Sequence, residues 1–206
     1  WCRKEHYLYY TNSLNVEVNM TANIDVSELL SFCHTNGYKF YPTLIYCVTK
    51  VLNRIENFKM FKDKNGDLCV WDSLVPNYTI FHEEDHTFSD CWTDFTDDFG
   101  SFYKNITSDM ELGKTKRGIK VKSGQPANFY CVSCTPWTTF TAVSSRMVNG
   151  GAALFPIITA GKYDDNYQMP VNITIAHAVA DGYHIGLFFE YLQKEISKEY
   201  LNSNLE

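Results

Sequence analysis

A histidine followed at short intervals by an aspartate, a glycine and a second histidine is the segment whose residue types could do chemistry. His177 ends an apolar, hydroxyl-rich run, and Asp181, Gly182 and His184 follow within seven residues. A strand that ends just before a helix can project an imidazole into a cleft, while the aspartate caps the helix. A neutral imidazole can accept a proton near pH 7, so His177 is a candidate general base.

Two other interpretations of this segment stay open on the residues alone. A histidine at a strand end is more often a packed, hydrogen-bonded structural residue than a catalyst. His177, Asp181 and His184 could instead hold a metal, since they are spaced four and three residues apart. Gly182 and the change from strand to helix argue against one face shared by all three side chains. We therefore expect no metal site.

The elements that must position this motif interleave without the strict alternation of a doubly wound sheet. Alternating or apolar runs predict strands at 15–23, 59–61, 68–71, 75–81, 128–133, 138–143, 157–162 and 169–175. Helical spacing predicts helices at 43–55, 94–112 and about 182–200, with a short one before Gly37. We predict one domain, spanning 1–206, built as an α/β two-layer sandwich of a mixed β-sheet with helices.

Local signals mark the ends of several of these elements. Residues 25–28 have the pattern of a capping box, and Gly37 follows the helix that the box would open. Pro42 suits the first turn of the next helix. Residues 63–66 are typical of a hairpin turn, and the basic, glycine-containing stretch 113–125 is the best candidate for a mobile loop.

Composition limits the class of function. A net charge of −6 argues against general nucleic-acid binding but leaves room for an anionic small ligand held by a few local cations. The seven cysteines are odd in number and lie mostly in apolar runs, so we expect buried, reduced thiols. No apolar run approaches the roughly 20 residues that span a bilayer, and no signal peptide is seen. We expect a cytoplasmic protein, and we expect further residues to precede Trp1 in the natural chain.

Seven stretches carry a resemblance to a known family over essentially the whole chain. They are WCRKEHYLYY, YKFYPTLIY, VWDS, FHEEDHTFS, VSCTPW, FPIITAGKY and HAVADGYHIG. In order and spacing they resemble the landmarks of the chloramphenicol acetyltransferases, a branch of the HxxxDG acyltransferases. A lone H-x-x-x-D-G is shared with the acyltransferase cores of 2-oxo acid dehydrogenase complexes, whereas the full ordered set is specific.

This resemblance implies the chemistry of the site. His177 matches the base that removes a proton from an acceptor hydroxyl, whose oxygen then attacks the thioester of acetyl-CoA. Ser133, by itself an ordinary strand serine, matches the serine that hydrogen-bonds the oxyanion, and Thr159 matches a threonine that positions a water. Asp181 matches a structural aspartate paired with Arg3, and such a pair is costly to break.

The resemblance also implies two binding regions and an assembly. Tyr10 matches a tyrosine of the acceptor site. Lys39, Tyr41, Lys162 and Tyr163 match positions that contact CoA, although each lysine alone could equally be a solvated charge. Acetyl-CoA is then a co-substrate and not a permanently bound cofactor. The family assembly implies a homotrimer with active sites at subunit interfaces.

Two departures from the family pattern bear on specificity. The family motif begins with two histidines, and Ala176 stands in place of the first. Bulky apolar side chains line the family's acceptor pocket, whereas the matching positions Val16, Val18, Val143 and Ser145 are smaller or more polar. The reacting groups therefore match the family better than the pocket that selects the acceptor.

The sequence predicts an O-acetyltransferase that acts on chloramphenicol or a related small alcohol by general-base catalysis in a ternary complex. A paralogue that acetylates a different hydroxyl acceptor is one alternative. A catalytically silent CoA-binding paralogue is another, against which the joint presence of His177, Ser133 and Asp181 argues. Transfer to a lipoyl thiol fits less well, because the sequence shows no lipoyl domain.

Overall fold

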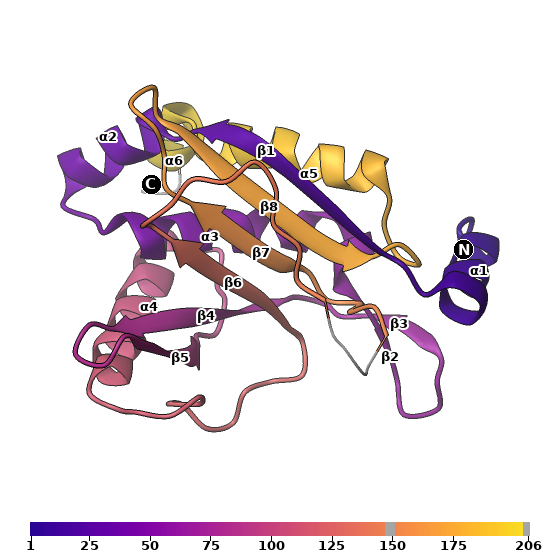
Figure 1. Cartoon of the computed structure of the whole chain (residues 1–206). Helices are drawn as coiled ribbons and strands as arrows, with labels where there is room; N and C mark the ends of the chain where they lie inside the picture. Colours follow the sequence, from indigo (N-terminus) through magenta and orange to yellow (C-terminus); the bar gives the residue numbers. More distant parts are fainter. Residues whose placement is uncertain (147–150, 204–206) are drawn as a thin grey trace.

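A six-stranded mixed sheet forms the centre of the fold in the computed structural model, which describes residues 1–146 and 151–203 (Figure 1). Its strands follow the order β1-β8-β7-β6-β4-β5. They are β1 (Glu17–Asp25), β4 (Val75–His82), β5 (Thr87–Trp92), β6 (Phe129–Thr135), β7 (Ile157–Gly161) and β8 (Gln168–Ala176). The three central strands β7, β6 and β4 are parallel, and the remaining neighbours are antiparallel.

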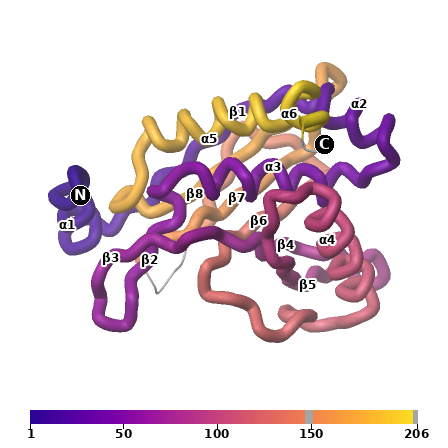
Figure 2. The backbone as a smooth tube through the Cα atoms, turned by 180° about the vertical axis from the view of Figure 1, so that it is seen from behind, coloured from indigo at the N-terminus to yellow at the C-terminus, as the bar shows by residue number. Residues whose placement is uncertain are grey.

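Helices α3 (Phe40–Arg54) and α5 (Gly182–Glu195) cover one face of this sheet. They lie behind it in Figure 1 and in front of it in Figure 2. The apolar stripes that the sequence predicts on these helices are buried, including Leu44, Val48 and Val51 on α3 and Ile185 and Phe188 on α5. The predicted two-layer α/β sandwich is therefore confirmed.

The remaining helices and a hairpin lie around this core. They are α1 (Lys4–Tyr9), the short π-helix η1 (Tyr10–Leu14), α2 (Ser27–Asn36), η2 (Glu56–Lys59), α4 (Phe99–Lys114) and α6 (Lys198–Ser203). The predicted hairpin is confirmed as β2 (Met60–Lys62) paired with β3 (Leu68–Val70). The sequence analysis missed α1, η1 and β5, because short elements with mixed composition leave a weak periodicity.

The other face of the sheet is polar along the central strands. Side chains alternate along a strand, and Val132 on β6 is buried on the helix side, so Ser133 faces away from the helices. The register aligns Ser133 with Thr159, Thr159 with Asn172 and Asn172 with Thr21 across four strands. Part of the chain between β6 and β7 runs across this face (Figure 1), and we call it the open face.

Gly161 shows how closely that connecting segment approaches the sheet. A Cβ atom placed on Gly161 would lie 2.8 Å from a ring carbon of Phe140, too close for any larger residue without a shift. Residues 138–143, predicted as a strand, instead form an irregular segment here. Phe140 lies against Gly161 of β7, whereas Ala142, the next apolar residue of the alternation, is exposed.

Three other boundaries differ from prediction. Helix α4 begins at Phe99 and not at 94, because Asp98 caps it by accepting a hydrogen bond from the Ser101 amide. The last predicted helix divides into α5 and α6. The capping box at 25–28 does not form, because the Glu28 carboxylate accepts a hydrogen bond from the amide of Lys198 instead. Gly37 does end α2, with a φ of 71°.

Ion pairs hold the stretch 113–125, the candidate mobile loop, against its surroundings. Lys120 pairs with Asp90 at 2.8 Å, and Lys122 pairs with Asp109 at the same distance.

The cysteines follow the prediction in part. Cys33, Cys47 and Cys91 are buried as expected, whereas Cys2 is exposed, so the prediction of a buried thiol is wrong for Cys2. Among the described residues, no helix combines the length and the apolar character needed to cross a membrane.

Candidate active site

His177 lies just past the end of β8, where the backbone and a neighbouring ring fix its imidazole. Its amide donates to the Val16 carbonyl at 2.8 Å, which continues the pairing of β8 with β1. The imidazole stacks on the Tyr10 ring with centroids 4.0 Å apart. Its Nδ1 lies 3.1 Å from the carbonyl of Ala180, which can only accept a hydrogen bond. In the neutral ring Nδ1 therefore carries the proton, and Nε2 has the lone pair that a general base needs.

Asp181 organises the turn that holds this histidine. It pairs with the Arg3 guanidinium, and it caps α5 through the Tyr183 amide at 3.1 Å. Arg3 also donates to the backbone carbonyl of His177 at 3.3 Å. Burial alone would raise the pKa of Asp181, but hydrogen bonds from His184 and the charge of Arg3 lower it below its ordinary value. The predicted pairing of Asp181 with Arg3 is confirmed, and the carboxylate is charged at neutral pH.

A contact that the sequence did not indicate joins His184 to Asp181 at the start of α5. Nδ1 of His184 donates a hydrogen bond to Oδ1 of Asp181 at 2.9 Å, so this nitrogen does not also accept from the Asp181 amide, which lies 3.3 Å away. The ring is therefore engaged with the start of α5 and does not face His177 as a co-ligand. Within the described part of the chain, His, Cys, Asp and Glu side chains nowhere gather in threes as a bound metal would require.

Ser133 and Thr159 are direct cross-strand neighbours on the open face of the sheet. Both are half-buried, so their hydroxyls sit at a surface that a ligand or another subunit could cover. A hydroxyl in this position can donate a hydrogen bond to a developing oxyanion. The next residue on the helix side, Cys134, is a poor competing nucleophile, because burial raises the pKa of its thiol to about 11.

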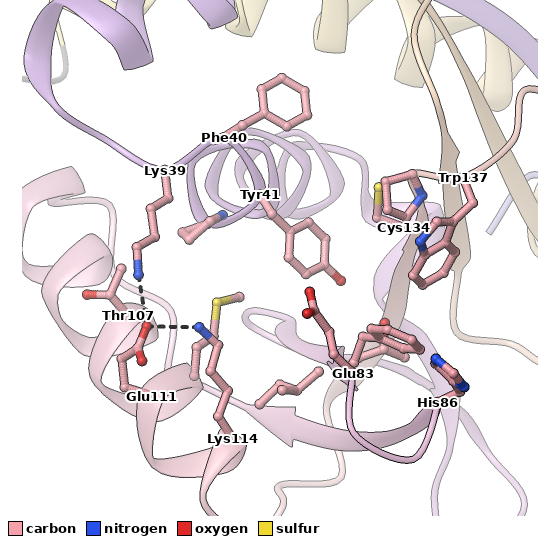
Figure 3. A pocket seen from close by; sticks show the side chains of 16 residues that line it. Lys39, Phe40, Tyr41, Glu83, His86, Thr107, Glu111, Lys114, Cys134 and Trp137 are labelled. Carbon is pink, nitrogen blue, oxygen red and sulfur yellow. Dashed lines mark hydrogen bonds and ion pairs between the residues drawn. The ribbon is translucent and has the colours of Figure 1, made fainter.

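A cavity of about 750 Å³ opens between the first turn of α3, helix α4 and strands β4 and β6 (Figure 3). Lys39 and Tyr41, two of the residues predicted to contact CoA, line it together with Trp137. The Tyr41 hydroxyl donates to the Val132 carbonyl at 3.3 Å, and burial raises the pKa of this phenol above its ordinary value. The cavity therefore offers apolar rings and a cation to one ligand.

Lys162 and Tyr163, the other two CoA candidates, follow the end of β7 near the same cavity. The amide of Lys162 donates to the Thr138 carbonyl at 2.9 Å. The Tyr163 ring lies 6.3 Å from that of Phe40, a cavity-lining residue. The structure thus gathers all four candidates around one end of the sheet.

The residues expected to bind the acceptor come from two separate parts of the chain. Val16 lies beside His177, and Val18 follows on β1. Val143 and Ser145 belong to the irregular segment between β6 and β7, where both are half-buried. The sequence analysis overlooked Glu17, which lies between the two valines and has one buried carboxylate oxygen without a hydrogen-bond partner among the described residues.

The predicted catalytic residues are far apart in a single chain. Thr159 aligns with Asn172, and His177 follows Asn172 by five residues, which is about 17 Å of extended strand. Ser133 lies one further strand across the sheet, a step of about 5 Å perpendicular to that direction. Because β8 is antiparallel to β7, His177 also lies at the opposite end of the sheet from Lys162. One chain alone does not bring the base to the oxyanion donor or the CoA candidates.

Comparison with known proteins places the chain in a family. A family model described as chloramphenicol acetyltransferase matches residues 1–193. The chloramphenicol acetyltransferase of Clostridium perfringens is 39% identical over 203 residues, which cover 97% of this chain and 92% of the relative. The chain belongs to the chloramphenicol acetyltransferase family. The predicted resemblance is confirmed, and with it the predicted class of enzyme, an acetyl-CoA-dependent acyltransferase.

Solved structures agree on the fold. A structure named chloramphenicol acetyltransferase aligns with a TM-score of 0.78 at 20% identity, covering 96% of each chain. The dihydrolipoamide acetyltransferase of Azotobacter vinelandii aligns with a TM-score of 0.68 at 14% identity, covering 98% of this chain and 88% of that one. At these identities the likeness concerns the fold alone, and it supports the mixed sheet with helices that the sequence predicts.

Proposed function

We propose that the chain acts as one acetyltransferase domain that moves the acetyl group of acetyl-CoA to a hydroxyl of chloramphenicol or a related small alcohol. The observation that carries this proposal is the pair of contacts that hold the imidazole of His177. Its Nδ1 is engaged by the Ala180 carbonyl, and its Nε2 is left as a base beside Tyr10. Relatives that align with nearly the whole chain, at 39% and 38% identity, are named for the same reaction.

In the proposed reaction His177 Nε2 takes the proton of the acceptor hydroxyl as its oxygen attacks the thioester carbonyl carbon. The negative charge that develops on the carbonyl oxygen accepts a hydrogen bond from Ser133. Thr159, next to Ser133 in the sheet, orders a water at the intermediate. When the carbon–sulfur bond breaks, the proton held by His177 passes to the departing thiolate. The products are the acetyl ester and CoA, with no acyl-enzyme.

Active sites shared between subunits would resolve the separation of these residues. Ser133 and Thr159 lie on the open face, and His177 lies at one end of the sheet. If these two surfaces met between neighbouring subunits, each would supply one half of an active site. We propose a homotrimer in which His177 of one subunit faces Ser133 of the next. A cyclic trimer has a head-to-tail interface, which brings two different surfaces of the same chain together.

The donor site of the proposed enzyme is the cavity of Figure 3. Lys39 and Lys162 supply positive charge for CoA phosphates, and Tyr41 and Tyr163 supply flat surfaces for its apolar parts. Acetyl-CoA enters as a co-substrate and leaves as CoA. We propose the cytoplasm as the compartment, because acetyl transfer draws on a soluble thioester and the cysteines of the chain are free thiols.

A different acceptor is the second candidate, and Glu17 favours it. A buried carboxylate oxygen that lacks a hydrogen-bond donor is costly, and it would be satisfied by an acceptor that carries an amine or amide hydrogen. Tyr10, whose ring stacks on His177, would contact the rest of such a molecule. The proposed chemistry at His177 and Ser133 is the same for both acceptors.

Release of CoA, followed with a thiol reagent, tests the proposal with chloramphenicol and a panel of amine-bearing alcohols. His177→Ala should abolish transfer, and Ser133→Ala should lower kcat by about 100-fold with little change in KM. His34→Ala, on the exposed surface of α2, is the matched control and should leave the rate unchanged. Release that persists in His177→Ala would reject the mechanism. CoA release with an amine-bearing alcohol but not with chloramphenicol would favour the second candidate, the different acceptor.

A further inference from the structure

Two lysine ammonium groups meet at one carboxylate oxygen on the wall of the cavity. Lys39 precedes the first turn of α3, and its Nζ lies 2.8 Å from Oε1 of Glu111. Lys114, at the end of α4, places its Nζ 3.1 Å from the same oxygen. Figure 3 shows the three side chains together, with both contacts drawn. Cations that converge on one oxygen from separate helices form a ready site for an anionic ligand.

We propose that Lys114 is a further phosphate-binding cation for CoA, beside Lys39, and that Glu111 occupies the phosphate position until the nucleotide arrives. This inference deepens the proposed function and rests on it, because it takes CoA as the ligand of the cavity. On binding, a phosphate oxygen takes the place of Glu111 Oε1 between Lys39 and Lys114. The displaced carboxylate turns toward solvent, where 55% of its side chain is already exposed.

The electrostatics of the three groups fit this exchange. Its hydrogen bond to Glu111 raises the pKa of Lys39, and the hydrogen bonds from Lys39 and Lys114 lower the pKa of Glu111. Lys39 and Glu111 are therefore both charged at neutral pH. Ion pairs as exposed as these contribute little stability, so a more highly charged phosphate can displace the carboxylate at small cost.

The charges on the rest of the cavity direct the anionic end of a ligand toward α4. Among the described residues that line the cavity, Lys39 and Lys114 are the two that always carry positive charge. Glu83 and His86 lie on the opposite side, in the turn between β4 and β5. A phosphate near Glu83 would meet a carboxylate, and the nearby Arg117 is already paired with Glu84 and Asp85. The α4 side is the favourable place for it.

Calorimetric titration with CoA, 3′-dephospho-CoA and pantetheine tests the inference. Lys114→Gln should weaken CoA binding about tenfold at low ionic strength, because a charged hydrogen bond is lost. Glu111→Gln should tighten it about fivefold, because the lysines lose a competing anion. Neither change should alter the binding of pantetheine, which has no phosphate. If the substitutions change the affinity for CoA but not for 3′-dephospho-CoA, Lys39 and Lys114 bind the 3′-phosphate. If they change the affinity for both, the two lysines bind the diphosphate.

The pair of Glu190 with Lys194 on α5 is the matched control, because its side chains are equally exposed and it lies outside the cavity lining. Glu190→Gln and Lys194→Gln should leave CoA affinity unchanged. Unchanged CoA affinity in Lys114→Gln, or an equal loss of pantetheine affinity, would overturn the inference. The proposed function would still stand in that case, provided that the wild-type protein binds CoA. Failure of the wild type to bind CoA would overturn both.

Discussion

The carboxylate of Asp181 joins the start of α5 to the N-terminal segment. It accepts hydrogen bonds from Arg3, His184 and the amide of Tyr183. One carboxylate thus fixes both the helix start and the Arg3 side chain that reaches the His177 carbonyl. Spacing in the sequence indicated the cap at Asp181. It could not indicate the contact with Arg3, because 178 residues separate the pair. The resemblance to the family supplied that contact.

Asp181→Asn should lower the free energy of unfolding at neutral pH by about 2 kcal/mol, because it leaves the Arg3 guanidinium without its anion. The folded pKa of Asp181 is lowered, so its charge-linked stabilisation is present above the ordinary carboxyl range. That stabilisation is lost as the pH falls through the lowered pKa. Urea unfolding at pH 7 and pH 3 should show the difference between wild type and variant shrinking in acid. An equal difference at both values would contradict the assignment.

Element boundaries followed side-chain hydrogen bonds more closely than apolar spacing. The spacing of Phe95, Phe99 and Phe102 predicted a helix from residue 94, but the helix starts where Asp98 can accept the Ser101 amide. Residues 138–143 show the converse, since their alternation looks like a strand although Phe140 packs on Gly161 of the sheet. Periodicity reports which side chains are buried, and it does not report which backbone groups pair.

Asp98→Ala should lower the free energy of unfolding, because the start of helix α4 loses the side chain that accepts the Ser101 amide. The hydrogen bond from Ser101 also lowers the pKa of Asp98, so the effect of the substitution should fade at low pH. Asp97→Ala, one residue earlier and equally exposed, removes the same charge without removing the cap. Chemical denaturation of both variants would show whether position 98 is special, and equal losses would reject the cap.

At the scale of the whole molecule, the reacting groups could be named from the sequence but their separation could not. His177, Ser133 and Thr159 were each singled out by a local pattern in a family context. Their positions relative to one another depend on strand order and register, which bring Thr159 level with Asn172 and leave His177 five residues beyond. Strand order is a long-range property, because pairing joins segments distant in the sequence.

Mixing two inactive variants tests where the site is assembled. If His177 of one subunit serves Ser133 of its neighbour, a trimer that contains both His177→Ala and Ser133→Ala subunits has some sites with both wild-type groups. Random assembly from equal amounts leaves about a quarter of the sites intact, so co-refolded protein should recover about a quarter of wild-type activity. A site built within one chain would carry a defect in every copy. Activity no higher than the average of the two separate variants would therefore reject the shared site.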